Sequence, residues 1–248
     1  HCVTRRQRQM CIRDRTIPNN ARWVHAAPMF HIADVTGAIA ITHIAGQHYF
    51  IPGFSPDAVL NSIQDYAITD TLLVPTMINM LVNHPDVKKY DLSSLRQITY
   101  GASPMPESVI IKAMEVIPKC DFAHAYGMTE TAPLLTIAPP DCHVFEGPKA
   151  NLFKSTGLAV TGVEIKIVDD NDNELPRGEV GEVAAKGANV MLGYWRQKEL
   201  SDKALRNGWM HTGDGGYMND EGYVYIVDRV KDMIISGGEN IYSAEVEN

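Results

Sequence analysis

The sequence predicts an α/β fold in which βαβ-type sheet layers with helices are followed by a β-rich part. Over residues 21–139, short apolar runs alternate with helix-length segments, which is typical of βαβ units. From residue 140 the pattern changes to strict alternation, with Val163, Ile165 and Ile167 on one face and charged residues between them. We therefore expect an α/β part over residues 21–139 and a β-rich part over residues 140–227.

The α/β part contains one complete predicted unit near its start. Apolar runs over residues 47–51 and 71–74 are predicted strands, and residues 55–66 between them are a predicted helix. Ser55 is a typical cap residue, and Pro56 suits the first helical position. Apolar side chains at helical spacing predict one buried face, which consists of Val59, Leu60, Ile63 and Ala67.

A second helix is predicted to open at Ser103 and Pro104, with Ser103 as its cap. Predicted strands over residues 95–100 and 121–125 each run directly into a glycine turn. Loops that follow strand ends are where such sheets bind ligands. The inner stripe of this helix consists of Val109, Ala113, Val116 and Ile117.

Two polar turns divide the β-rich part, at residues 169–174 and at residues 219–222. The second turn lies between apolar, aromatic segments that are predicted strands. Charge interrupts the strand pattern at residues 228–232, and Gly237 and Gly238 follow a short apolar run. This interruption predicts a domain boundary close to the end of the sequence.

The composition excludes several classes of protein. Of the 248 residues, 45% are hydrophobic and 21% are charged, which argues against a disordered, collagen-like or coiled-coil chain. Acidic residues outnumber Lys and Arg by 30 to 22, so no nucleic-acid partner is expected. The apolar runs are shorter than the roughly 20 residues of a membrane span. We therefore expect a soluble protein without a transmembrane segment. The four cysteines have neither disulfide nor zinc-site spacing, which favours a cytoplasmic location.

Residues 1–20 differ in composition from the rest of the chain. Residues 1–15 hold five arginines and one acidic residue, and no apolar run of a signal peptide follows them. A basic arm for RNA or membranes is one interpretation. Foreign or misread sequence is the interpretation that we favour, and the fold prediction leaves this segment out.

Several familiar motifs are absent or incomplete. Asp169, Asn171 and Asn173 begin like a calcium loop, but Glu174 stands where that loop requires glycine. The segment around Ser103 lacks the second glycine of a hydrolase nucleophile elbow. The patterns HExxH, GxxxxGKS/T and GxGxxG do not occur. The sequence therefore predicts neither a calcium site nor a serine hydrolase, a zinc protease, a P-loop ATPase or a dinucleotide fold.

Glycine-flanked polar residues remain as candidates for binding. A hydroxyl beside a carboxylate, as in Thr129 and Glu130, can hold a phosphate oxygen and a magnesium ion. Tyr126 offers an aromatic face to a base, and Asp214 between glycines offers acceptors to a ribose diol. Each has an ordinary structural alternative. The Thr-Glu pair can be a helix start, the Gly-Asp-Gly segment a turn, and the charged segment at residues 228–232 a solvated strand edge.

Six ordered motifs resemble those of the adenylate-forming enzymes, and within them those of the acyl-CoA synthetases, the fatty-acid–CoA ligases. The resemblance covers residues 21–248. In chain order the motifs read PMFH at 28–31, YGASP at 100–104, AYGMTET at 125–131, GEVGE at 178–182 with GYW at 193–195, GWMHTGD at 208–214, and DRVKDMIISGGENIY at 228–242.

The resemblance implies an acid–thiol ligase that works in two steps. The carboxylate of an acid attacks the α-phosphate of ATP to give acyl-AMP and pyrophosphate, and the thiol of coenzyme A then displaces AMP. ATP, Mg²⁺ and coenzyme A are thus the implied cofactors and co-substrates, and a small-molecule carboxylic acid is the implied substrate. The oligomeric state stays open, a homodimer included.

The resemblance also implies a domain plan. Residues 21–139 and 140–227 are expected to be two parts of a large AMP-binding domain. Residues 228–248 are expected to be the hinge and the truncated start of a small α+β C-terminal domain. Lys231 matches the family's hinge, where the small domain swings between the two half-reactions, and is counted among the implied catalytic residues.

Matching the motifs residue by residue implies a nucleotide site. Tyr126 is expected to stack on adenine, and Asp214 and Arg229 are expected to bind the ribose. Thr129 is expected to bind the α-phosphate, and Glu130 is the expected magnesium ligand, so both are implied catalytic residues. The remaining implied nucleotide-binding residues are Gly101, Ala102, Ser103 and Gly127.

The same matching implies an acyl side. Its expected residues are His31, Val35, Gly37, Met77, Gly127, Thr131, Ala132 and Pro133. An amino-acid substrate is disfavoured, because His31 stands where relatives that activate amino acids carry an aspartate. Small and apolar residues here favour an aliphatic fatty acid, although ordinary core packing explains them equally well; they are Ala33, Val35, Gly37, Ala38, Met77 and Met80.

Two parts of the family pattern have no counterpart in the sequence, namely the phosphate loop rich in Ser, Thr and Gly and the C-terminal catalytic lysine. The chain is therefore expected to be an internal fragment that makes little or no acyl-CoA by itself. A non-catalytic nucleotide- or acyl-binding remnant is the alternative. The intact remaining motifs favour the ligase.

Overall fold

The computed structural model describes residues 20–230, 234–236 and 239–241. The chain divides into two compact units, unit 1 (His1–Ala125) and unit 2 (Tyr126–Asn248). The change in sequence pattern expected near residue 139 falls inside unit 2, and the predicted division into residues 21–139, 140–227 and 228–248 stays a prediction.

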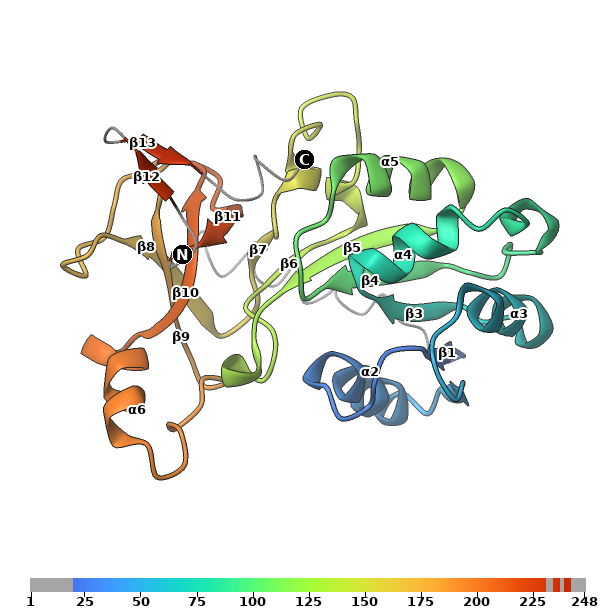
Figure 1. The fold of residues 1–248 in the computed structure, drawn as a ribbon, viewed down its shortest axis with the longest axis horizontal. Coiled ribbons are helices and arrows are strands. Elements are labelled where there is room, and N and C mark those ends of the chain that lie inside the picture. The colour runs from blue at the N-terminus through green and yellow to red at the C-terminus, as the bar shows by residue number, and fades with distance from the viewer. Residues whose placement is uncertain (1–19, 231–233, 237–238, 242–248) are drawn as a thin grey trace. The chain divides into compact units, whose positions relative to one another are not determined.

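Unit 1 is built on parallel strands that follow the order β2-β1-β3-β4-β5. Figure 1 shows α4 and α5 on one side of strands β3 to β5 and α2 on the other side. The strand order reverses direction between β1 and β3, and sheets of this kind bind ligands beyond the carboxyl ends of the strands at such a point. The elements are β1 (Arg22–His25), α2 (Ile32–His43), β2 (Gln47–Phe50), α3 (Pro56–Tyr66), β3 (Asp70–Leu73), α4 (Pro75–Val82), the 3₁₀ turn η1 (Val87–Lys89), β4 (Gln97–Gly101), α5 (Glu107–Val116) and β5 (Asp121–Tyr126).

The first predicted unit is confirmed in its local detail. The Ser55 hydroxyl accepts a hydrogen bond from the Ala58 backbone N–H at 3.1 Å, and Pro56 occupies the first turn of α3. Val59, Leu60 and Ile63 are fully buried. Ala67, predicted on the same face, is only half-buried and lies just beyond the helix, which it ends with a left-handed φ of 49°.

The predicted start of the second helix is wrong. Helix α5 begins at Glu107, and Pro106 rather than Ser103 occupies its N-cap position. Ala102 adopts a φ of 69°, and Ser103 is exposed. Prolines at 104 and 106 disfavour a helical conformation in the residues before them, so the helix begins three residues later than predicted.

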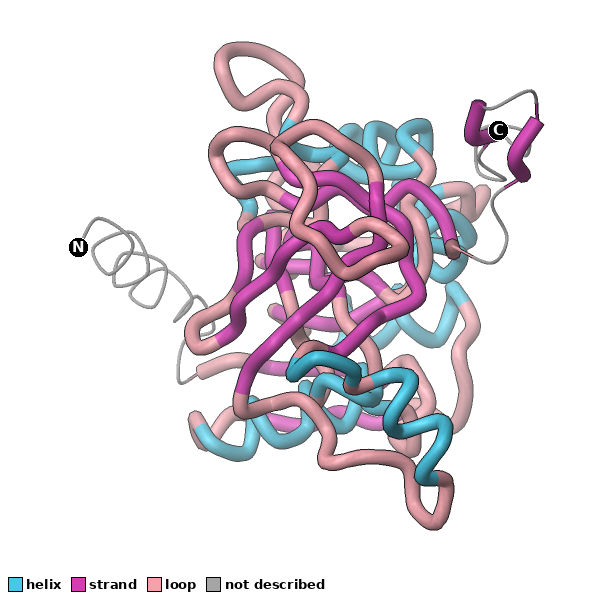
Figure 2. Tube along the Cα trace, turned by 90° about the vertical axis from the view of Figure 1, so that its left-hand side faces the viewer, coloured by secondary structure: helices cyan, strands magenta, loops and turns pink. Residues whose placement is uncertain are grey.

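Unit 2 is mostly strand and loop, and α6 is the α-helix found among its described residues (Figures 1 and 2). Its main sheet is antiparallel, with strand order β11-β10-β9-β8. The elements are η2 (Thr129–Thr131), β6 (Thr136–Ala138), η3 (Pro140–Cys142), η4 (Leu152–Lys154), β7 (Leu158–Ala159), β8 (Val163–Val168), β9 (Gly181–Gly187), α6 (Lys198–Ala204), η5 (Arg206–Gly208), β10 (Met210–Met218), β11 (Val224–Arg229), β12 (Ile234–Ser236) and β13 (Glu239–Ile241).

The predicted hairpin turns of unit 2 are confirmed. The Asp169 carboxylate accepts hydrogen bonds from the backbone N–H groups of Asn171 and Asn173, at 2.9 and 2.8 Å. The Asn219 side chain accepts from the N–H groups of Glu221 and Tyr223. These contacts are local side-chain turns of the kind that Asp and Asn favour. Each of the four strands of the antiparallel sheet contributes one residue to a buried core cluster, which consists of Ile167, Val183, Met218 and Val224.

Candidate functional site

A carboxylate in strand β10 is the centre of the candidate site in unit 2. Asp214 Oδ2 accepts a hydrogen bond from the Tyr126 hydroxyl at 2.7 Å, across 88 residues of sequence. Asp214 Oδ1 accepts from Arg229 Nε at 2.9 Å. Arg229 stands directly opposite Asp214 in the pairing of β10 with β11. The structure thus brings together three of the residues predicted to bind one nucleotide.

Burial dominates the electrostatics of this group. Asp214 is 8% exposed, and burial raises the pKa of its carboxyl, against the lowering effects of the Tyr126 hydroxyl and the Arg229 charge. The pKa of the Tyr126 phenol is raised well above its usual value, first by burial and then by the Asp214 charge. Tyr126 is therefore a protonated donor at neutral pH. The Arg229 side chain is 53% exposed, as expected of the solvated strand edge that was the alternative for this segment.

The backbone of β10 is distorted where it presents Asp214. Gly213 has a φ of 74°, and the pairing with β9 shifts register between His211 and Gly215. The Gly213 N–H donates to Glu182 Oε1 at 2.9 Å, and the Asp214 N–H donates to the Thr212 hydroxyl at 3.1 Å. The Gly-Asp-Gly segment is therefore part of a strand, and its interpretation as a simple turn is wrong.

A glycine-dependent loop carries the predicted phosphate and magnesium ligands. Thr129 starts the one-turn 3₁₀ helix η2 and is exposed, so the helix-start interpretation describes the local backbone correctly. Glu130 Oε1 accepts a hydrogen bond from the Tyr194 hydroxyl at 2.9 Å. A Cβ atom on Gly127 would collide with the Pro133 carbonyl oxygen, so this loop closes only around glycine.

The other predicted nucleotide residues lie where β4 ends in unit 1. Gly101 is the last residue of β4 and pairs with Ala125 of β5. A Cβ atom on Gly101 would collide with the Ala125 carbonyl oxygen, so the close approach of these strands requires glycine. Ala102 and Ser103 follow it and are both exposed. These three residues therefore stand at the carboxyl edge of the parallel sheet, as expected of ligand-binding residues.

The predicted acyl residues of unit 1 follow the carboxyl ends of β1 and β3. His31 is the exposed residue that precedes α2, while Val35 and Gly37 lie on α2 and Met77 on α4. Gly37 is buried, and a Cβ atom there would lie 2.6 Å from Cζ2 of Trp23. Gly37 thus packs against β1, which matches the core-packing alternative for that position.

Unit 1 also contains a largely buried hydrogen-bonded group that no sequence motif indicated, formed by His25, Asp34 and His48. His25 Nδ1 lies 2.9 Å from Asp34 Oδ2, and His25 Nε2 lies 2.9 Å from His48 Nδ1. His25 and Asp34 are 3% and 0% exposed, and the His25 ring stacks on Phe50. These hydrogen bonds link β1, β2 and α2. Tyr194 and Glu182 were also missed as individual residues, although both stand in quoted motifs.

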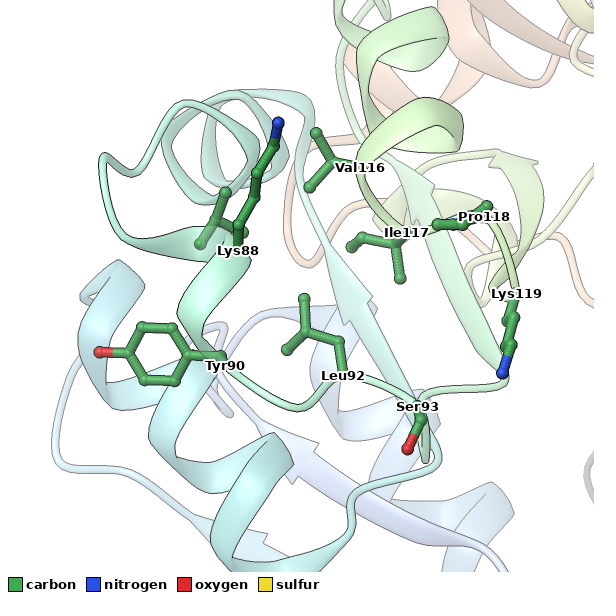
Figure 3. Close-up of a pocket in the computed structure, with 9 residues that line it drawn as sticks. Lys88, Tyr90, Leu92, Ser93, Val116, Ile117, Pro118 and Lys119 are labelled. Carbon is green, nitrogen blue, oxygen red and sulfur yellow. The ribbon is translucent and has the colours of Figure 1, made fainter.

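The cavity in Figure 3 lies at the other edge of the unit 1 sheet. Its volume is about 320 Å³, and its lining includes residues just before β4 and β5. Leu92, Val116 and Ile117 point toward its centre, while the amino groups of Lys88 and Lys119 lie at its margins (Figure 3). None of the predicted site residues lines it.

Within the described residues, no group of three or more His, Cys, Asp and Glu side chains is arranged to hold a metal ion. No described helix is long and apolar enough to cross a membrane. Lys231 and residues 1–19 lie outside the described residues.

Comparison with known proteins identifies the family. Residues 2–195 match the family model described as "AMP-binding enzyme". The chain belongs to the AMP-binding enzymes. This membership confirms the resemblance to the adenylate-forming superfamily, and the parallel and antiparallel sheets confirm the predicted fold class. The match begins within residues 1–20, and the assignment of that segment as foreign sequence stays a prediction.

Curated relatives include several acid ligases. The chain is 37% identical over 221 residues to a fatty acid–[acyl-carrier-protein] ligase of Streptomyces coeruleorubidus, which covers 89% of this chain and 42% of the relative. It is 36% identical to a long-chain-fatty-acid–CoA ligase of Escherichia coli, over 93% of this chain and 40% of the relative. A feruloyl-CoA synthase of an Amycolatopsis species is also 36% identical, over 94% of this chain and 46% of the relative. This chain thus spans less than half the length of each.

Solved structures of similar proteins support the same family. An o-succinylbenzoate coenzyme A synthetase of Bacillus subtilis, solved with ATP and magnesium ion, superposes with a TM-score of 0.82 at 32% identity, over 94% of this chain and 47% of that one. An amide bond synthetase of Marinactinospora thermotolerans superposes with a TM-score of 0.80 at 33% identity, over 92% of this chain and 44% of that one.

Proposed function

We propose that this protein activates a carboxylic acid with ATP to acyl-AMP and pyrophosphate and then forms the acyl-CoA thioester with release of AMP. The Asp214 carboxylate carries this proposal, because it stands between two further predicted nucleotide-binding residues of an AMP-binding enzyme. Such a reaction depends on positioning of the reactants and on stabilisation of charge at the phosphates. The ligase names of the relatives support acid activation in general.

In this proposal Asp214 accepts hydrogen bonds from the ribose hydroxyls. Both carboxylate oxygens already have protein donors, so ribose binding exchanges one partner for another. Arg229 is the partner that moves, because its side chain is half exposed while Tyr126 lies among the core residues Ile167 and Val183. The ring of Tyr126 is the proposed stacking surface for adenine, and Gly101, Ala102 and Ser103 stay proposed nucleotide-binding residues of unit 1.

Glu130 is the proposed magnesium ligand. The described residues hold no preformed cluster of metal-binding side chains, which fits Mg²⁺, an ion usually held by one or two carboxylates with phosphate oxygens and water. When bound, Mg²⁺ would neutralise charge on the phosphates. Thr129, exposed at the start of η2, is the proposed α-phosphate donor.

A fatty acid is the acid that we propose as substrate. The small and apolar residues predicted for the acyl side support an aliphatic chain, with Val35 and Met77 half-buried on α2 and α4, the helices that follow β1 and β3. Relatives named for ferulate and indoleacetate mark aryl acids as the main competitors. Coenzyme A is the proposed thiol, and Lys231 is the proposed hinge.

Binding and exchange experiments test the proposal in order. AMP and ATP affinities are measured first on the 248-residue chain. Acid-dependent exchange of pyrophosphate into ATP is then measured on the protein expressed from its whole gene, with decanoate, ferulate and indoleacetate. Exchange highest with decanoate supports the fatty-acid ligase. Nucleotide binding without exchange for any acid supports a non-catalytic nucleotide-binding remnant. No nucleotide binding by either protein refutes the ligase and leaves only the acyl-binding form of the remnant.

A further inference from the structure

The Glu130 carboxylate has a specific neighbour from a distant segment. Tyr194, 64 residues along the chain, donates its hydroxyl hydrogen to Glu130 Oε1 at 2.9 Å. Among the residues that the structure describes, the Tyr194 hydroxyl is the hydrogen-bond donor to the Glu130 carboxylate. The contact occupies one carboxylate oxygen and leaves Oε2 for another partner.

Tyr194 is itself held by a serine of helix α6. Its backbone N–H donates to the Ser201 hydroxyl at 2.8 Å, and that hydroxyl donates to the Gln197 carbonyl oxygen at 2.8 Å. Gly193 has a φ of 143°, and a Cβ atom there would lie 3.0 Å from Ser201 Oγ. The backbone that carries the Tyr194 ring is therefore anchored by α6.

The preceding residues attach the same segment to the Glu130 loop. The Met191 N–H donates to the Glu130 carbonyl oxygen at 2.8 Å. The Asn189 amide donates to the carbonyl oxygens of Thr131 and Leu134, at 2.7 and 3.0 Å. The segment 189–194 thus holds both the backbone and the side chain of Glu130.

We propose that Tyr194 is a positioning residue that orients the Glu130 carboxylate for Mg²⁺, so that Oε1 is held by the phenol and Oε2 faces the ion. This inference rests on the proposed function, in which Glu130 binds the ion. Groups that hold a metal-ligating carboxylate through its other oxygen typically change metal affinity by 10–100-fold when they are removed. A neutral phenol suits this role, because it fixes the carboxylate without cancelling its charge.

The test is Tyr194→Phe in the 248-residue chain, with Tyr225→Phe as the matched control. Tyr225 lies in the same unit, where its ring stacks on Tyr217 at 4.7 Å between centroids. The first readout is the Mg²⁺ midpoint, the Mg²⁺ concentration that gives half of the maximal increase in ATP affinity. The other two readouts are the AMP affinity without Mg²⁺ and thermal unfolding. For Tyr194→Phe we expect the Mg²⁺ midpoint to rise about tenfold or more, with AMP affinity within about twofold of the original.

A double-variant comparison separates positioning from general support of the fold. In a Glu130→Ala background, Tyr194→Phe should leave ATP affinity unchanged at every Mg²⁺ concentration, because the carboxylate that it orients is gone. The inference is overturned if Tyr194→Phe keeps the original Mg²⁺ midpoint, if it weakens AMP and Mg-ATP equally, or if its effect persists without Glu130. An original chain whose ATP affinity does not respond to Mg²⁺ at all overturns the proposed role of Glu130 as well.

Discussion

Replacing Asp214 by alanine gives the most direct test of the nucleotide site. A hydrogen bond to a charged group contributes about 1.5–3 kcal/mol. Without nucleotide, the carboxylate already accepts from Tyr126 and Arg229, so ribose binding replaces an existing bond and does not simply add one. We therefore expect Asp214→Ala to weaken AMP by about 2 kcal/mol, near the lower end of that range, which corresponds to about thirtyfold in the dissociation constant.

Two ligands make the measurement specific for the ribose. AMP and 2′,3′-dideoxy-AMP are titrated calorimetrically into the original chain and into Asp214→Ala. The original chain should prefer AMP by about thirtyfold, and the variant should bind both ligands with similar affinity, because the acceptor that distinguishes them is absent. Asp202→Ala serves as the control, since Asp202 is an exposed carboxylate on α6 that pairs with Lys198.

Stability has to be followed in the same experiment. Asp214→Ala leaves the buried hydroxyl of Tyr126 without its acceptor, which costs about 1–3 kcal/mol, while loss of a buried charge offsets part of that cost. The variant should therefore stay folded at 25 °C, as thermal unfolding can verify. An unchanged AMP affinity would refute the assignment of Asp214 to the ribose, and so would an equal loss for both ligands.

Three further predictions concern the surroundings of the site. Glu182→Gln replaces the charged acceptor of the Gly213 N–H by a neutral one. The variant should have a free energy of unfolding lower by about 1–3 kcal/mol and an AMP affinity that is severalfold weaker. Equal urea midpoints for the variant and the original chain would contradict this. Burial lowers the pKa of His143 from 6.5 to about 4. Below pH 6.5, His143 is therefore protonated in the unfolded chain while it stays neutral in the folded chain. The contribution of His143 to the free energy of unfolding should thus be fully present above pH 6.5 and should be lost by up to about 1.4 kcal/mol per pH unit toward pH 4. Urea unfolding at pH 7 and pH 5 should show a smaller loss of stability for His143→Asn than for the original chain. Gly101→Ala should destabilise the chain by about 1–3 kcal/mol, whereas Gly53→Ala, with open space at its Cα, should have little effect on the thermal midpoint.

Features that depend on a few neighbouring residues were predictable from the sequence. The start of α3 follows from a hydroxyl and a proline side by side, and the turn at Asp169 follows from a carboxylate that bonds to the next few N–H groups. The order of the short motifs was sufficient to predict the family. Helix α5 shows the limit of this reasoning, because residue type favours Ser103 as the cap whereas Pro106 occupies the N-cap position. The left-handed Ala102 and the non-helical residues after it place the start at Glu107.

The partnerships within the candidate site depend on the tertiary structure. Asp214 meets Tyr126 across 88 residues, and Glu130 meets Tyr194 across 64. Residue types and motif order identified Asp214, Tyr126 and Glu130 as candidates. Tyr194 stood within one of the motifs, but nothing in the sequence gave it a role of its own. Periodicity and capping report only on neighbours along the chain, within a turn or a strand. Which distant side chains share a hydrogen bond is decided by strand register and by the glycine-dependent backbone that aims each side chain, and those are properties of the folded sheet.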